Sequence, residues 1–262
     1  MTDPTFFALD IRTGVAVATF DRPPVNALSA AAYEELERVI DRIETSDEVR
    51  AVVLASPPDA RAWIAGADLN DFKSLDYDTR LARYQLVNRC MGRLAGLSRP
   101  IIAAINAHAI GAGMTVASLC DIRVASSEAE FAMPEIDRGT TSAGGIHFNR
   151  LHLPSGITRE MLFTGRRFSA AELTHWGYID HVVERAAVVP KALEIASLIA
   201  SKDPEAVRVT KLCCNAVEQL PWADALALTQ EHSARLTAGK AAKEGISAFL
   251  EGREPSYTKP AS

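Results

Sequence analysis

A stretch between Arg99 and Glu135 carries the residue types of a site that stabilises negative charge on an oxygen. It opens with an apolar β-type run, 101–105, passes through the small residues Gly111-Ala112-Gly113, and continues into the apolar helical segment 114–119. The first N–H groups of a helix have no partner within the helix, and glycines let a ligand come close to the backbone. Glu135 adds a carboxylate nearby. Such a site suits chemistry that builds up negative charge on an oxygen.

The segments around this stretch alternate between strands and helices up to about residue 187. Apolar runs at 6–10 and 15–20, separated by a turn, predict an antiparallel hairpin. Ser29 is a suitable N-cap for a helix over 30–44. Further strands are expected at 51–55, 101–105, 121–125 and 181–183, and further helices at 79–97, 157–163 and 170–176. This alternation predicts an α/β fold.

From about residue 190 the pattern is helical throughout. Helices are expected at 191–200, 204–220, 222–238 and 241–250. We therefore divide the chain into an α/β part, residues 1–189, and a C-terminal helical region, residues 190–262. Such a region either covers the core or packs on another subunit.

The composition is that of an ordinary globular protein. The chain has 262 residues, of which 48% are apolar and 23% are charged. The net charge of −5 argues against nucleic-acid binding, which needs a basic surface, but allows a small anionic ligand. The four cysteines lack the spacing of a disulfide pair or a metal site, so we expect reduced thiols and no metal. The absence of a signal-like N-terminus and of any apolar run of membrane-spanning length predicts a cytoplasmic protein without membrane contact.

Short motifs spread over most of the chain add a more specific indication. They are Asn26-Ala27-Leu28, Ala65-Gly66-Ala67-Asp68, Ile105-Asn106-Ala107-His108-Ala109-Ile110-Gly111-Ala112-Gly113, Cys120-Asp121-Ile122, Phe131-Ala132-Met133-Pro134-Glu135, Ala143-Gly144-Gly145, and Thr164-Gly165-Arg166-Arg167 with Trp176-Gly177. In order and spacing they resemble the motifs of the crotonase (enoyl-CoA hydratase/isomerase) superfamily. The resemblance implies a spiral of ββα units with a C-terminal α-helical region, a homotrimer or dimer of trimers, and an acyl-CoA thioester as substrate. It implies no cofactor, since coenzyme A is part of the substrate.

The resemblance also implies roles for individual residues. The backbone N–H groups of Ala67 and Ala112 would hold the thioester oxygen as it becomes an enolate oxygen. Backbone carbonyls around Ala65, Ala67 and Leu69 would bind the adenine amine of coenzyme A, and Ala27 would lie beside the pantetheine. Arg22 is the best-placed cation for the phosphates, although a freely solvated side chain is equally expected. The expected contacts with substrate or coenzyme A are Arg22, Ala27, Ala65, Ala67, Asp68, Leu69, His108 and Gly111.

Two positions bear on the reaction. Hydratases of the superfamily carry two glutamates that hold one water, and the matching positions here are Thr115 and Glu135. Threonine can hydrogen-bond a water or a carbonyl but cannot serve as a base near neutral pH. A lone carboxylate can still remove a proton from one carbon of an enoyl thioester and return it to another. The sequence therefore favours 3-to-2 enoyl-CoA isomerisation with Glu135 as the proton shuttle.

Other readings stay open at this point. Enoyl-CoA hydration with Thr115 helping to hold the water is the first alternative, and a non-catalytic acyl-CoA-binding protein is an alternative of another class. The same scaffold could also support decarboxylation, dehalogenation or carbon–carbon hydrolysis. His108 and His147 could line the acyl pocket or be structural, and Asp137 is more typical of a surface or capping residue.

Overall fold

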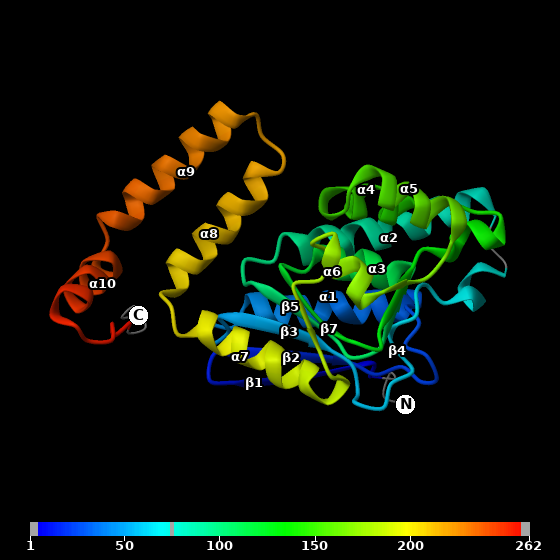
Figure 1. Cartoon of the computed structure of the whole chain (residues 1–262), viewed down its shortest axis with the longest axis horizontal. Helices are drawn as coiled ribbons and strands as arrows, with labels where there is room; N and C mark the ends of the chain where they lie inside the picture. Colours follow the sequence, from blue (N-terminus) through cyan, green and yellow to red (C-terminus); the bar gives the residue numbers. More distant parts are fainter. Residues whose placement is uncertain (1–4, 74–75, 258–262) are drawn as a thin grey trace.

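The main sheet is the frame of the protein (Figure 1). The structure is a computed structural model that describes residues 5–73 and 76–257, with the backbone alone for 147–151. The six strands of the main sheet lie in the order β1-β2-β3-β5-β7-β10. Strands β1 and β2 form the expected antiparallel hairpin, and every later pairing is parallel. The strands are β1 (Phe7–Arg12), β2 (Val15–Phe20), β3 (Ala51–Ala55), β5 (Ile101–Ile105), β7 (Ile122–Ser126) and β10 (His181–Val183).

A second sheet of short strands runs beside the first, in the order β4-β6-β8-β9. Strands β4, β6 and β8 are parallel and each follows a strand of the main sheet along the chain, while β9 closes the edge antiparallel to β8. A helix follows each such pair of strands, so the expected spiral of ββα units is confirmed. The strands are β4 (Ala62–Ile64), β6 (His108–Ile110), β8 (Glu130–Ala132) and β9 (Phe168–Ser169).

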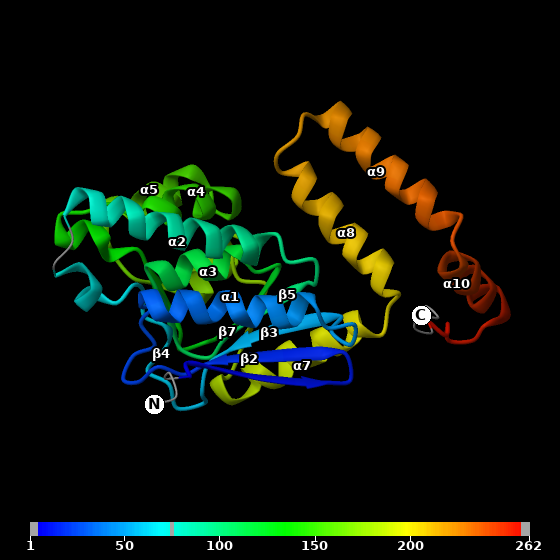
Figure 2. The same cartoon turned by 180° about the vertical axis from the view of Figure 1, so that it is seen from behind.

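Helices cover both faces of the main sheet (Figures 1 and 2). Along β3, Val52 and Leu54 enter the cluster that includes α1 (Ala30–Glu44), whereas Ala51 and Val53 enter the cluster that includes α7 (Val188–Ala200). This alternation is expected of a parallel strand that is buried on both sides. Helix α1 begins as predicted, with the side chain of Ser29 accepting a hydrogen bond from the N–H of Ala32 at 3.2 Å.

The first layer of helices above the sheet also holds the site. Helix α2 (Tyr77–Ala95) packs on α1, and α3 (Ala112–Leu119) lies between α2 and α4 (Ala143–His152). Three short 3₁₀ helices and two more α-helices complete this part of the chain: η1 (Leu69–Phe72), η2 (Pro134–Arg138), η3 (Arg185–Ala187), α5 (Ser155–Thr164) and α6 (Ala170–His175).

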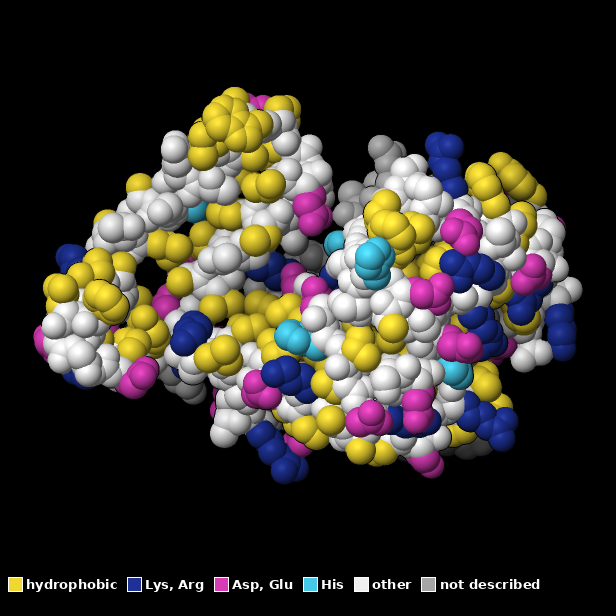
Figure 3. All heavy atoms as spheres, viewed as in Figure 1, with side chains coloured by type: hydrophobic (Ala, Val, Ile, Leu, Met, Phe, Trp, Pro, Cys, Tyr) yellow, Lys and Arg dark blue, Asp and Glu magenta, His cyan; other side chains and the backbone are white. Residues whose placement is uncertain are grey.

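The C-terminal region is helical, as expected, but its first helix belongs to the core. The expected boundary at residues 189 and 190 falls inside α7, which packs on the main sheet. Helices α8 (Pro204–Val217), α9 (Trp222–Thr237) and α10 (Lys240–Glu251) extend away from the sheet (Figures 1 and 2). Apolar side chains gather on their surface in Figure 3, and Trp222, Phe249 and Leu250 are each at least 78% exposed. In the part of the chain described here, no helix has both the length and the apolar character needed to cross a membrane.

Candidate active site

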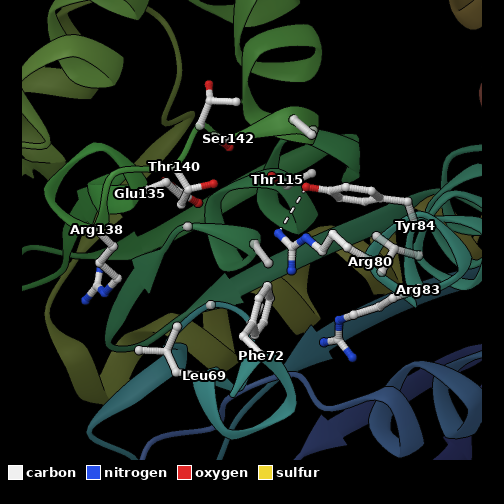
Figure 4. Close-up of a pocket in the computed structure, with 18 of the residues that line it drawn as sticks. Leu69, Phe72, Arg80, Arg83, Tyr84, Thr115, Glu135, Arg138, Thr140 and Ser142 are labelled. Atoms are coloured by element: carbon white, nitrogen blue, oxygen red, sulfur yellow. Dashed lines mark hydrogen bonds between the residues drawn. The ribbon is translucent and has the colours of Figure 1, made fainter. Parts of the chain in front are cut away.

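A cavity of about 540 Å³ lies above the carboxyl ends of β4 and β6 (Figure 4). The turn after β4, the start of α3 and helix η2 form one wall, and the inner face of α2 forms the other. Figure 4 shows Glu135 and Arg138 on one side of the cavity and Arg83 and Tyr84 on the other. Ala65, Gly66, Ala67, Gly111, Ala112 and Thr115 all line it.

Two turns meet at the mouth of this cavity. Gly66 and Gly111 both have positive φ, +101° and +55°, a conformation that glycine adopts without strain. A β-carbon on Gly66 would lie 3.1 Å from the carbonyl oxygen of Ile110 and 3.7 Å from the backbone nitrogen of Ala112. The residue after Gly66 is Ala67, so the two expected N–H donors are held on neighbouring turns.

The backbone around Ala67 explains why its N–H is left for the cavity. The N–H groups of Ala65 and Asp68 donate to Asn26 and Leu28, at 3.1 and 2.9 Å. These two hydrogen bonds use N–H groups that come before and after Ala67 in the chain. Within residues 5–73 and 76–257 we find no backbone acceptor for the N–H of Ala67.

Ala112 is the first residue of α3, so the helix provides no acceptor for its N–H. Gly113 lets α3 come this close to β4, because a β-carbon there would overlap the carbonyl oxygen of Ile64. Both alanines are half-buried and line the same cavity. A thioester oxygen placed between these two N–H groups would also lie on the axis of α3, where the helix dipole favours negative charge.

Glu135 lies on η2 with its carboxylate against the start of α3. A β-carbon on Gly111 would lie only 2.9 Å from Oε1 of Glu135. Its Oε2 atom is buried and has no hydrogen-bond partner among the described residues. Burial raises the pKa of the Glu135 carboxyl above its ordinary value, against the opposing influence of the Arg138 charge. A buried carboxylate with an unused oxygen is suited to accept a proton from a ligand.

Thr115 lies one helical turn beyond Ala112, on the same side of α3. Its side chain is buried and borders the cavity, and its N–H donates to the carbonyl of Gly111 at 3.2 Å. The structure thus brings together Ala67, Ala112, Thr115 and Glu135, the four residues expected to act on the substrate.

The expected contacts with substrate or coenzyme A fall into two groups. Ala65, Ala67, Leu69 and Gly111 line the cavity, and Leu69 is 55% exposed at its edge. Arg22 joins two other expected contacts, because it donates to the carbonyl of Ala27 at 3.0 Å and to Oδ2 of Asp68 at 2.6 Å.

Arg22 is therefore not the freely solvated side chain that the sequence equally allowed. Burial acts to raise the pKa of Asp68, but hydrogen bonds from Asn70 and Arg22 lower it overall. The ion pair thus links the turn before α1 to the turn after β4, which fixes the segment that carries Ala67.

Three further residues named from the sequence lie away from the cavity or outside the description. His108 is not among the cavity-lining residues that the structure describes. Its Nδ1 accepts a hydrogen bond from the N–H of Glu130 at 3.1 Å, which gives it a structural role at the start of β6. The side chain of His147 is outside the described residues. Asp137 is exposed on η2, and a β-carbon on Gly165 would lie 3.0 Å from its Oδ2.

The α2 wall of the cavity is the part that the motifs do not reveal. Arg80, Arg83 and Tyr84 line it together with Val87 and Met91. Tyr84, Val87 and Met91 recur at helical spacing within the expected helix over 79–97, which places them on one face. Extending that spacing back by four residues reaches Arg80, so the periodicity could have found this side chain.

Comparison with known proteins gives a consistent result. A family model described as enoyl-CoA hydratase/isomerase matches residues 10–260. The chain is 34% identical over 242 residues to the short-chain-enoyl-CoA hydratase of Clostridium acetobutylicum, covering 92% of each protein. It is 32% identical over 259 residues to the mevalonyl-coenzyme A hydratase of Aspergillus fumigatus, covering 93% of this chain and 91% of that protein. The solved structure of an enoyl-CoA hydratase from Bacillus anthracis aligns with a TM-score of 0.92 at 30% identity, covering 98% of this chain and all of that one.

The chain therefore belongs to the enoyl-CoA hydratase/isomerase family, and it has the crotonase fold of its structural neighbours. It is an acyl-CoA enzyme of that family.

Proposed function

We propose that this enzyme isomerises 3-enoyl-CoA thioesters to 2-enoyl-CoA thioesters. The observation that carries the proposal is the lone carboxylate of Glu135, half-buried with its Oε2 fully buried, and Thr115 at the position where the family's hydratases have a second glutamate. One carboxylate is sufficient for a reaction that moves one proton, whereas the activation of a water by two acids is not available.

The proposed reaction moves a proton from C2 to C4 of the acyl chain. Glu135 removes a C2 proton, and the electron pair left at C2 delocalises onto the thioester oxygen to give a dienolate. The N–H groups of Ala67 and Ala112 stabilise that oxygen. Glu135 then returns the proton to C4, the double bond moves from C3–C4 to C2–C3, and no water is consumed.

The environment of Glu135 supports this role. A carboxyl whose pKa is raised by burial is a stronger base when it is ionised. Its Oε2 has no hydrogen-bond partner among the described residues, so it can accept a proton without first breaking a hydrogen bond to any of them. The coenzyme A portion is proposed to lie along Ala65, Leu69 and the turn that Arg22 ties to Asp68.

Enoyl-CoA hydration is the second candidate. It is favoured by the names of the two relatives described above, both of which are hydratases by name at 32–34% identity. In this reaction Glu135 would activate the water and Thr115 would help to hold it. The buried position of Thr115 beside the cavity is compatible with that role.

A homotrimer or a dimer of trimers is proposed as the working assembly. The support comes from the apolar side chains of α8–α10, which the single chain leaves exposed. Exposed apolar patches of this kind are typical of protein interfaces. Sedimentation equilibrium of the purified protein should give a mass of three or six chains, and a monomer would contradict the assembly.

The reaction is tested by supplying the purified protein with matched 3-enoyl-CoA and 2-enoyl-CoA substrates. Isomerisation predicts steady conversion of the 3-enoyl thioester to the 2-enoyl thioester. Hydration of the 2-enoyl thioester without such conversion would overturn the proposal in favour of the second candidate. Tight binding of both thioesters without turnover of either would identify a non-catalytic acyl-CoA-binding protein.

A further inference from the structure

Arg80 has an unusual setting on the α2 wall of the cavity. Its guanidinium carbon lies 4.0 Å from the centre of the Phe72 ring and 4.7 Å from that of Tyr84, and it donates to the Tyr84 hydroxyl at 3.0 Å. Figure 4 shows this guanidinium extending from α2 into the space between the two walls. The side chain is half-buried, and the two rings fix its position.

A neighbouring arginine shows what Arg80 lacks. Arg83, one turn further along α2, also faces the cavity, but its charge is balanced by Oδ2 of Asp71 at 2.7 Å. Among the described residues, no carboxylate lies within 4.0 Å of Arg80. A partly desolvated cation is costly unless it is paired, so the cavity has one unbalanced positive charge on its α2 wall.

The position of Arg80 distinguishes the acyl group from coenzyme A as its partner. The thioester is fixed by Ala67 and Ala112 at the start of α3, and the coenzyme A portion is proposed to leave along Ala65 and Leu69. Thr115, one turn further into α3, lines the same cavity, and α3 packs against α2. Arg80 stands on that α2 wall, so it meets the part of the acyl chain beyond the reacting carbons.

We infer that the enzyme acts on acyl-CoA thioesters whose acyl chain ends in a carboxylate, and that Arg80 is the residue that binds this carboxylate. A guanidinium offers two parallel N–H groups that match the two oxygens of a carboxylate. Stacking between Phe72 and Tyr84 holds the group in advance, which lowers the entropy lost on binding. The inference rests on the proposed placement of the thioester at Ala67 and Ala112.

The test is a binding measurement that needs no turnover. Saturated acyl-CoA thioesters of four to eight carbons are compared in pairs, one member ending in a methyl group and the other in a carboxylate, by isothermal titration calorimetry. At the chain length that reaches Arg80, the carboxylate member should bind at least about tenfold more tightly. Equal or weaker binding of the carboxylate member at every length would overturn the inference.

Substitutions locate the effect. Arg80→Met should abolish the preference, and continued binding of the methyl-ended thioester shows that the variant is folded. Arg138→Met, which removes an exposed cation from the opposite wall, should leave the preference intact. Loss of the preference in Arg138→Met and its retention in Arg80→Met would contradict the assignment. Because saturated thioesters cannot be isomerised, loss of this preference is distinguishable from failure of the proposed reaction.

Discussion

The two ends of the cavity are built in different ways. At the end proposed to hold the thioester, the groups that face the cavity are the backbone N–H groups of Ala67 and Ala112, held by glycines whose side-chain space is filled by neighbouring atoms. At the acyl end they are side chains of α2, which are positioned by stacking and by ion pairs. The first construction tolerates little change, because any side chain at the glycines meets other atoms. The construction from α2 side chains can be altered by substituting one residue at a time.

This contrast indicates where the reaction and the substrate are determined. In the proposed reaction these N–H groups would stabilise the enolate oxygen of any acyl group, because they would contact only the thioester. We propose that the choice between reactions depends on the few acids that face the substrate, and that the choice of acyl group depends on α2. Substitutions can test that division, beginning with Glu135, whose side chain lies beside the two backbone turns.

The largest effect is expected for Glu135→Gln. The substitution keeps the shape of the side chain but removes the base, so kcat should fall by about 10³-fold while acyl-CoA affinity stays within about threefold. Steady-state kinetics and calorimetry measure the two quantities. Asp137→Asn is the matched control, because Asp137 is an exposed acid two residues along the same 3₁₀ helix. An equal loss in Asp137→Asn would show that Glu135 has no special role.

Gly111→Ala should damage the backbone end without removing any functional group. The new β-carbon would lie 2.9 Å from Oε1 of Glu135, and the alanine would have to adopt the positive φ of Gly111. We expect the free energy of unfolding to fall by about 1–3 kcal/mol. We expect kcat to fall by about tenfold or more, because the carboxylate must move. Denaturant unfolding and kinetics check both effects.

Gly156→Ala is the control for this substitution. Gly156 lies in α5, and an added β-carbon there meets no atom within 4 Å. Alanine is the better helix former, so the variant should be as stable as the wild type or more stable. Equal behaviour of the two variants would mean that the space at Gly111 does not matter.

Thr115→Glu should shift the reaction toward hydration. The substitution supplies the second acid, and hydration of a 2-enoyl-CoA should rise by about tenfold or more if that acid is what is missing. Some stability should be lost, because the side chain of Thr115 is buried. Thr115→Gln has the same size without the acid and should show no gain. A gain in both variants, or in neither, would contradict the explanation given for the missing acid.

The smallest effect is expected in the pH dependence. Because burial raises the pKa of Glu135 above its ordinary value of 4.5, kcat/KM should decline on the acid side with an apparent pKa above 4.5.

The same shift affects stability. Between 4.5 and the raised pKa the folded protein binds more protons than the unfolded chain, so this carboxyl makes the free energy of unfolding fall as pH rises through that window. Glu135→Gln should lack this decline, and urea titrations of both proteins at several pH values measure it. A steeper decline in the variant would contradict the sign.

Much of the fold could be predicted because its patterns are local. The runs at β3 and β5 and the cap at Ser29 each have a signal within a few residues, and the motifs set the register of the spiral. Strands β8 and β9 have only three and two residues, which is too short for a periodic pattern, and they were not predicted.

The backbone end of the site could be predicted for the same reason, whereas long-range partners could not. Ala67, Ala112 and Glu135 are identified by motifs of adjacent residues. The ion pair of Arg22 with Asp68 joins residues 46 positions apart, and no feature of either segment predicts that they pair. The placement of β6 beside β8 likewise decides whether His108 faces the cavity or Glu130.

The central claim is that one carboxyl both removes the C2 proton and delivers it to C4. A 3-enoyl-CoA labelled with deuterium at C2, converted in a single turnover in ordinary water and analysed by NMR, tests it directly. The account predicts that part of the 2-enoyl-CoA product has deuterium at C4, because Glu135 is shielded by burial and returns the atom that it took. Conversion that proceeds with no deuterium at C4 would contradict the account, since the proton would then come from water or from another group.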